Sequence, residues 1–378
     1  MKKILFNNIN NSFNYTKNFE LLFSDYELFR KKYFSSQCIE LLKSTFTSSD
    51  LFLTHSATGA LEMIASLIDI KNGDEVIMPS FTFVSTANAF VSKGATPVFI
   101  DIEPNTLNID CSLIEQAITP KTKAIIAVHY AGHACNMEVL KQICEKHQLY
   151  LIEDAAMAFG NSWQGKPLGS IGHFGVISFD ITKQITAIQG GLLLVNDETF
   201  KERAPQIYHI GTNRTAFQKN NVPYYEWVDI GSKYQMNELN AAVLFEQLQN
   251  SSSILQHRNQ LSKWYYAKLL ALQEAGFLKL PPLEFLNNNV HEFYLILNTW
   301  QERDALSNYL NNGGIEALFH YIPLHNSEMG NKTSRFVGTG FTTHISKQIL
   351  RLPLHNLLNK DDIGQITNKI NYYFANEK

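Results

Sequence analysis

A carboxylate and a lysine follow two apolar runs and could face one cleft. Asp154 ends the run LYLI, and the segment SFDITK places Ser178 and Lys183 directly after another apolar run. A buried carboxylate needs a charged or strongly hydrogen-bonding partner, because an unpaired one is costly to remove from water. A lysine amine can act as a nucleophile and can transfer protons. These residues therefore indicate one catalytic cleft.

A stretch of small residues, HSATGALEM, precedes them and has the composition of a capped helix start. A helix N-terminus can bind phosphate. Together the three features indicate pyridoxal 5'-phosphate (PLP), because its aldehyde needs a lysine, its protonated ring nitrogen needs a carboxylate, and its phosphate needs N–H donors. Taken singly, each feature is also typical of something simpler: a surface lysine, a strand-end cap and an ordinary helix start.

The elements that must position these residues alternate between strand and helix. Between about residues 50 and 200, helical patterns such as FVSTANAFVSKG separate six apolar runs: DEVIMPS, ATPVFIDI, KAIIAVHYAG, LYLIEDAA, FGVISFD and GGLLLVND. This alternation predicts an α/β domain. Because the runs are continuously apolar, we expect strands covered on both faces in a mainly parallel sheet. Ligands bind such sheets at the carboxyl ends of the strands.

The alternation stops after GGLLLVND. Residues 237–270 then predict a long helical connection, because apolar residues recur at helical spacing: Leu239, Val243, Leu244 and Leu248. Beyond it, EFYLILNT and ALFHYIPL are predicted strands, and DIGQITNKINYYFA belongs to a closing helix. We therefore divide the chain into residues 1–250, with an N-terminal segment and a large α/β domain, and residues 251–378, a smaller α+β domain.

Composition and charge exclude several classes of protein. With 378 residues, 45% of them hydrophobic, the chain can form about two well-buried domains. A formal net charge of -3 and the lack of a basic block argue against a nucleic-acid or anionic-membrane binder. The four cysteines lack metal-site spacing, and neither a signal-peptide core nor an apolar run of 18 residues is present. We expect a cytoplasmic protein without a metal site.

Taken in order, the motifs resemble the DegT/StrS family of nucleotide-sugar aminotransferases, which has the aspartate aminotransferase fold of fold-type-I PLP enzymes. The resemblance covers about residues 50–360. It is greatest to the branch that makes dTDP-4-amino-4,6-dideoxygalactose, in the segments PSFTFVSTANAF, GTNR, DIGS and HYIPLH. It implies PLP-dependent transfer of an amino group from L-glutamate to a dTDP-4-keto-6-deoxy-hexose. The product would serve surface polysaccharide synthesis, and the enzyme would be a homodimer with shared active sites.

Carried over residue by residue, the resemblance makes Lys183 the lysine that bonds to PLP and Asp154 the partner of the ring nitrogen. Phe83 would stack on the ring, whereas core packing is the simpler role for a phenylalanine. The residues implied at the phosphate are Thr58, Gly59 and Ser178. Lys233 stands where the family commonly offers an asparagine to the neighbouring subunit's phosphate, and a solvated surface lysine is the simpler interpretation.

The resemblance also implies candidates for binding the amino donor or the nucleotide-sugar. They are Asn213, Arg214, His320, Tyr321 and His325. Loop capping and core packing are the alternative roles for these residues.

Several residues around the predicted centre depart from the family pattern. Met157 replaces a glutamine that would hydrogen-bond the cofactor's phenolic oxygen, and a thioether is at best a weak acceptor. Asp180 replaces a histidine and could raise the pKa of Lys183. The remaining departures are Gln184, Ile188 and Gln189, in place of Asn, Gly and Glu.

These departures leave two alternatives to a 4-aminotransferase. One is another PLP-dependent keto-sugar enzyme, such as a 3-aminotransferase or a dehydratase. The dehydratase branch replaces the lysine with histidine, so the retained Lys183 argues against it. The other alternative is a non-catalytic relative that has kept the fold.

Overall fold

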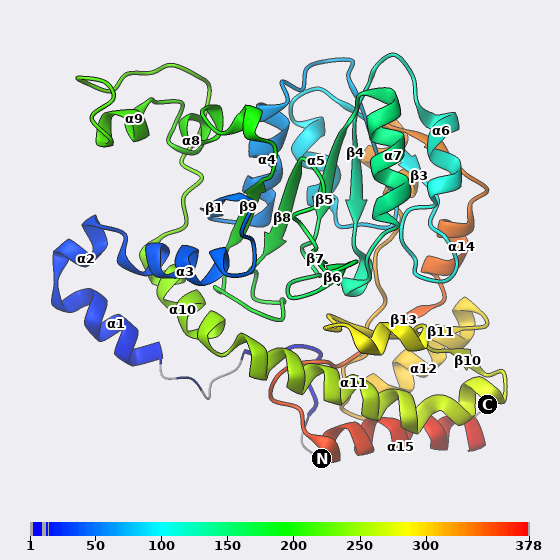
Figure 1. The fold of residues 1–378 in the computed structure, drawn as a ribbon. Helices are drawn as coiled ribbons and strands as arrows, with labels where there is room; N and C mark the ends of the chain where they lie inside the picture. The colour runs from blue at the N-terminus through cyan, green and yellow to red at the C-terminus, as the bar shows by residue number, and fades with distance from the viewer. Residues whose placement is uncertain (1–2, 10–12, 14, 377–378) are drawn as a thin grey trace.

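An eight-stranded sheet forms the centre of the large domain in the computed structural model, which describes residues 3–9, 13 and 15–376 (Figure 1). The strand order is β1-β9-β8-β5-β4-β2-β3-β12. Within this sheet only β9 is antiparallel to its neighbours, so the predicted mainly parallel sheet is confirmed. The strands are β1 (Asp50–Thr54), β2 (Glu75–Pro79), β3 (Thr96–Ile100), β4 (Thr122–Val128), β5 (Tyr150–Asp154), β8 (Phe174–Ser178), β9 (Gly191–Val195) and β12 (Arg335–Val337).

Helices cover both faces of this sheet. The six predicted apolar runs form β2, β3, β4, β5, β8 and β9, and alternate residues of each strand enter cores on opposite faces of the sheet. Val76 and Ile126 pack in the core that contains α4 (Ala57–Leu67) and α5 (Val84–Val91). On the other face, Ile77 and Ile125 pack with α6 (Ile114–Ala117) and α7 (Met137–His147). The continuous apolar character of the strands therefore follows from their burial on both faces.

A three-stranded antiparallel sheet, β10-β11-β13, organises the small domain. Two helices, α10 (Glu238–Gln249) and α11 (Ser251–Glu274), form the predicted long connection, and α11 runs beside the closing helix α15 in Figure 1. The other elements of this domain are β10 (Leu278–Lys279), β11 (Phe293–Leu297), α12 (Trp300–Asn312), β13 (Ile349–Leu352) and α15 (Lys360–Asn376).

The prediction of a strand at ALFHYIPL is wrong. Within it, Leu318 makes an isolated bridge to Arg351, and the chain then runs to a short 3-10 turn at Leu324–Asn326. Pro323 has no N–H to donate to a sheet ladder. In addition, the side chain of Arg351 donates two hydrogen bonds to the backbone carbonyl of Phe319, which is then not available to a neighbouring strand. This segment therefore forms a wall of a cavity and not a strand.

The predicted domain division differs from the structure at two segments. Strand β12 lies beyond residue 250 but pairs in parallel with β3 at the edge of the large sheet. Conversely, Ile4 forms a parallel bridge with Ile315, so the described N-terminal residues pack on the small domain. The chain therefore crosses between the domains at both ends. Helices α13 (Glu328–Thr333) and α14 (Phe341–Ser346) flank β12 along the chain, and the short strands β6 (Ser162–Trp163) and β7 (Lys166–Pro167) form a separate hairpin.

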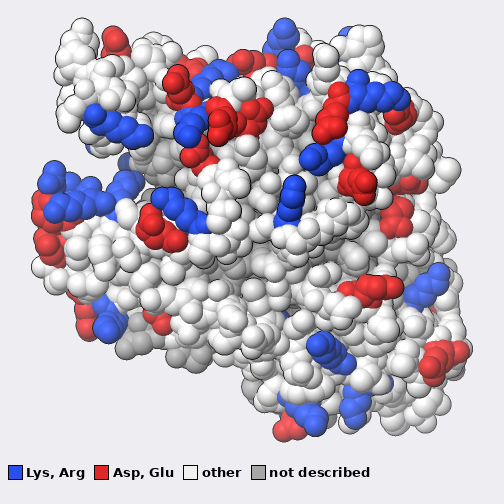
Figure 2. All heavy atoms as spheres, in the orientation of Figure 1, with Lys and Arg blue, Asp and Glu red and all other residues white. Residues whose placement is uncertain are grey.

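Two peripheral segments project from one side of the large domain in Figure 1. One consists of α1 (Tyr15–Ser24), α2 (Tyr26–Arg30) and α3 (Tyr33–Lys43); the other is the excursion at residues 209–235, which follows α8 (Arg203–Tyr208) and contains α9 (Arg214–Gln218). On the face in Figure 2, basic and acidic side chains of the described residues are interspersed. Among those residues, no helix has the length and apolar character needed to cross a membrane.

Candidate active site

A cavity of about 740 Å³ lies at the carboxyl ends of β5 and β8, between the two domains. Residues from the N-terminal segment, the large domain and the small domain all line it. It contains most of the residues that the sequence predicted at the site. These are Thr58, Phe83, Asp154, Met157, Ser178, Lys183, His320 and Tyr321.

Asp154 is buried at the last position of β5, where it is 6% exposed. Its Oδ2 accepts a hydrogen bond from the hydroxyl of Thr86 at 2.8 Å, and its Oδ1 accepts one from the N–H of Ala156 at 3.2 Å. The Thr86 hydroxyl also lies 2.9 Å from that of Thr82. Because Thr86 belongs to α5, the helix orients the carboxylate toward the cavity. The sequence pattern did not indicate Thr86.

Lys183 lies half-buried in the turn that follows β8, and its backbone N–H donates to the carbonyl of Asp180. Burial lowers the pKa of the Lys183 amine, although the nearby carboxylates of Glu292, Asp154 and Asp180 oppose this shift. The expected increase in pKa through Asp180 is therefore outweighed. The carboxylate of Asp180 also accepts two hydrogen bonds from Thr182, which closes the turn around the lysine.

Hydroxyl groups and a helix N-terminus form part of the cavity lining. Thr58 lies in the first turn of α4 and donates a hydrogen bond to Ser85 at 2.8 Å, and Ser178 ends β8 nearby in the same cavity. Gly59, in contrast, is not among the lining residues of the described chain, and its N–H donates to the hydroxyl of Ser56. A Cβ at Gly59 would come within 2.7 Å of the His55 ring. The absence of a side chain at Gly59 therefore allows close packing against His55, and its role at the phosphate stays a prediction.

The chemistry of this lining fits PLP. The hydroxyls and the start of α4 suit a phosphate, the Asp154 carboxylate suits a protonated ring nitrogen, and the Lys183 amine suits an aldehyde. Phe83 caps the start of α5 and is 57% exposed at the cavity, so its ring is available for stacking. Met157 also lines the cavity and is 4% exposed.

Two aromatic residues from the segment before Pro323 form another wall. The rings of His320 and Tyr321 stack with centroids 3.7 Å apart, and the ring of Phe83 lies 6.4 Å from Tyr321. The Nδ1 of His320 lies 2.7 Å from the hydroxyl of Tyr130. Burial lowers the pKa of His320 to about 3, so its imidazole is neutral at pH 7. This wall therefore presents aromatic faces and a neutral imidazole to a ligand.

Three titratable residues that line the cavity were not predicted: His291, Glu292 and Arg351. Glu292 directly precedes β11, and Arg351 lies in β13 opposite Tyr294. Because Glu292 and Tyr294 are two residues apart and Tyr294 pairs with Arg351, the side chains of Glu292, Tyr294 and Arg351 share one face of the small sheet. The signal available in the sequence was a charge next to or within an apolar run, in EFYLIL and ILRLPL.

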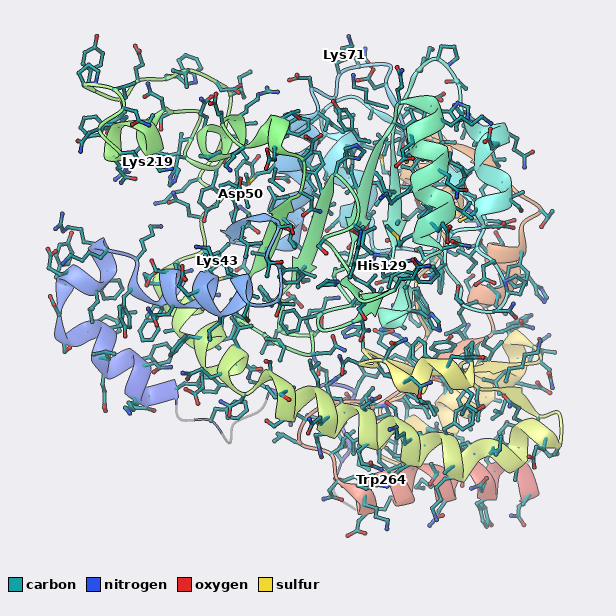
Figure 3. The ribbon with its side chains drawn as sticks, viewed as in Figure 1. Lys43, Asp50, Lys71, His129, Lys219 and Trp264 are labelled. Atoms are coloured by element: carbon teal, nitrogen blue, oxygen red, sulfur yellow. The ribbon has the colours of Figure 1, made fainter. Side chains whose placement is uncertain are left out.

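Three other predicted residues lie outside this cavity in the described chain. All belong to the excursion at residues 209–235: Asn213, Arg214 and Lys233. The carbonyl oxygen of the Asn213 side chain accepts from the N–H of Glu226 at 2.8 Å, and the Arg214 guanidinium lies 6.0 Å from the Tyr225 ring centre. In Figure 3, Lys219 lies on the same excursion, well away from His129 at the end of β4. One subunit alone therefore does not bring these residues to Lys183.

The candidate His325 also lies outside the cavity lining within the described residues. Its ring stacks on Phe336 at 3.9 Å, and its two nitrogens contact the hydroxyls of Ser80 and Thr343. These contacts join the small domain's loop to the large sheet. His325 therefore packs between these two parts of the chain, and a role in binding the substrate stays a prediction.

The remaining departures from the family pattern differ in position. The amide of Gln184 is buried and donates to the carbonyl of Asn289, away from the cavity lining, whereas Gln189 lines the cavity. Ile188 has a φ of 69°, a left-handed conformation that costs a β-branched residue free energy and suits glycine. The backbone of this turn thus keeps a conformation suited to the family's glycine.

Comparisons with known proteins agree with this geometry. Residues 46–371 match the sequence profile of the DegT/DnrJ/EryC1/StrS aminotransferase family. The chain belongs to this family. It is similar to the spore coat polysaccharide biosynthesis protein SpsC of Bacillus subtilis, with 31% identity over 327 residues that cover 82% of each chain. The chain is accordingly a PLP-dependent enzyme of the sugar aminotransferase class.

Solved structures support the same fold. An aminotransferase from Psychrobacter cryohalolentis superimposes with a TM-score of 0.82 and 27% identity, over 90% of this chain and 91% of that one. PseC of Helicobacter pylori, an aminotransferase involved in the biosynthesis of pseudoaminic acid, gives a TM-score of 0.88 over 99% and 100% of the two chains. Its identity is 23%, so this likeness shows the fold alone. The predicted fold-type-I architecture is confirmed.

Proposed function

We propose that the enzyme transfers the amino group of L-glutamate to a 4-keto-6-deoxy-hexose carried on dTDP, giving a dTDP-4-amino-4,6-dideoxy sugar for surface polysaccharide. The observation that carries this proposal is the convergence of Lys183, Asp154 and Ser178 in one cavity with the aromatic wall of His320 and Tyr321. Bound PLP supplies an electron sink that stabilises a carbanion.

The residues that line the cavity then divide the work of the reaction. The Nζ of Lys183, whose pKa burial lowers, takes up a proton from the amino donor and returns one to the sugar carbon. Asp154, held by Thr86, keeps a proton on the ring nitrogen. Ser178, Thr58 and the start of α4 bind the phosphate.

The apolar character of the cavity mouth supports a deoxygenated sugar. Large apolar side chains remain exposed there, with Phe83 at 57%, Phe319 at 55% and Ile322 at 65%. A methyl group at C6 loses contact with water against such surfaces, which favours binding by about 0.8 kcal/mol per buried carbon. A fully hydroxylated sugar would lose this gain.

We propose further that the enzyme is a homodimer and that the excursion at residues 209–235 completes the partner's site. Several of its large apolar side chains are exposed: Ile210, Tyr224, Tyr225, Trp227 and Ile230. Burial against a second subunit would remove them from water. The same contact would carry Lys233 toward the partner's phosphate, and Asn213 and Arg214 toward its substrate.

The test is a panel of nucleotide-linked keto-sugars incubated with the enzyme, PLP and L-glutamate, with the products identified by mass spectrometry and their amino position by NMR. A 4-amino-4,6-dideoxy product from the dTDP-4-keto sugar is expected. Amination at C3 would favour the 3-aminotransferase alternative, and loss of water without amination would favour a dehydratase. No turnover of any 4-keto sugar would overturn the proposal.

A further inference from the structure

The small domain's face of the cavity holds a buried carboxylate, and only one of its two oxygens accepts a hydrogen bond from a described residue. Glu292 and His291 are 8% and 4% exposed. The Oε1 of Glu292 accepts a hydrogen bond from Nη1 of Arg351 at 2.7 Å. Its Oε2 and the Nδ1 of His291 make no hydrogen bond to any described residue, although both residues line the cavity.

Neighbouring groups do not satisfy this oxygen. The Nδ1 of His320 lies 3.5 Å from Oε2, but it is hydrogen-bonded to Tyr130. Burial alone would raise the pKa of the Glu292 carboxyl, yet Arg351, His320, His291 and Lys183 outweigh burial and hold this pKa well below its usual range. The group is therefore a carboxylate at neutral pH. A buried charged oxygen without a donor costs free energy, so its retention at a cavity wall points to a donor on a ligand.

The guanidinium of Arg351 is fixed beside it with donors to spare. Its Nε and Nη2 donate to the carbonyl of Phe319 at 3.2 and 2.9 Å, and its plane lies over the Phe6 ring at 4.8 Å. Arginine has five N–H groups, so two remain beyond these bonds and the one to Glu292. The cavity wall therefore presents a fixed acceptor next to fixed donors.

This pairing selects the chemistry of its ligand. A second carboxylate on Arg351 would lie beside the free oxygen of Glu292, and like charges in a buried site repel. A hydroxyl group, in contrast, can donate to Glu292 and accept from Arg351 at the same time. We propose that Glu292, Arg351 and His291 form a subsite that binds a hydroxyl group of the sugar ring of the amino acceptor. This inference rests on the proposed function and names the surface that recognises its substrate.

The experiment measures binding to the PLP form by calorimetry, with dTDP-4-keto-6-deoxyglucose and its 2-deoxy and 3-deoxy analogues as probes. In Glu292→Gln, an amide N–H can replace the free acceptor oxygen while the size of the side chain is kept. We expect wild type to lose about 10- to 100-fold in affinity for one deoxy analogue, and Glu292→Gln to bind the parent and that analogue equally. The control is Glu274→Gln, which removes an exposed carboxylate from the end of α11 and should behave as wild type.

If Glu292→Gln does not fold, the double variant Glu292→Met/Arg351→Met provides the same comparison, because apolar side chains of similar length can replace a buried ion pair. The subsite is overturned if wild type binds the parent and both deoxy analogues equally. It is also overturned if Glu292→Gln changes only the pH profile of the L-glutamate half-reaction, since Glu292 would then serve Lys183. Failure of wild type to bind any keto-sugar, with the L-glutamate half-reaction intact, would overturn the proposed acceptor together with the subsite.

Discussion

Replacing Asp154 with asparagine should separate catalysis from folding. The carboxylate lies at the end of β5 with hydrogen bonds from Thr86 and Ala156. An asparagine oxygen can still accept from Thr86, but its amide then faces the N–H of Ala156, and the loss of that long bond costs about 1 kcal/mol of stability. A contacting charge pair in a partly solvated site is worth about 4 kcal/mol. Because the amide dipole restores part of this interaction, we expect the transition-state free energy to rise by about 2–4 kcal/mol. The value of kcat/KM should then fall roughly 30- to 1000-fold.

The assay compares kcat/KM with thermal unfolding of the same Asp154→Asn protein loaded with PLP. Thr86→Val serves as the matched variant, because it removes one hydrogen bond to the carboxylate and leaves its charge. Its activity should fall by about 10-fold at most. Near-normal turnover of Asp154→Asn would refute the assigned role. A loss of activity that tracks a large fall in Tm would show that Asp154 acts mainly in folding.

Three further predictions concern the subunit contact, the lysine and the strained turn. Mixing the Lys183→Ala and Lys233→Ala variants of the proposed homodimer, if each is inactive, should restore partial activity, because one heterodimer site is then intact; no recovery after confirmed subunit exchange would contradict shared sites. Glu292→Gln removes a carboxylate that raises the pKa of Lys183, so the rising limb of the half-reaction's pH profile should move to lower pH; a move to higher pH would contradict this sign. Ile188→Gly relieves the left-handed φ of an exposed residue and should stabilise the fold by about 1 kcal/mol, measured as a higher Tm; a lower Tm would show that the side chain packs usefully.

The sequence predicted the large sheet well because its strands are buried on both faces. Continuous apolar runs such as DEVIMPS, placed between helical segments, are typical of central strands in a parallel sheet. The segment ALFHYIPL has equally apolar residues, but it borders a cavity, where proline and side-chain bonds to the backbone replace a ladder. Local composition does not distinguish these two environments.

The candidate site was predictable where one short motif carries the chemistry. Lys183, Ser178 and Asp154 each follow or end a strand of the same sheet, so their positions at its carboxyl edge could be inferred. Glu292 and Arg351 reach the same cavity from a different domain, and only the packing of that domain brings them there. The excursion that carries Lys233 shows the opposite case, because its motif is specific but its proposed site requires a second chain.

The bond between Lys183 and PLP is the central claim about this enzyme. Borohydride reduction of the PLP-loaded enzyme, followed by proteolysis and mass spectrometry, measures this bond directly. We predict a pyridoxyl label on the peptide that contains SFDITK, at Lys183, and no stable label in Lys183→Ala. A label on any other lysine of the wild-type enzyme would contradict the claim.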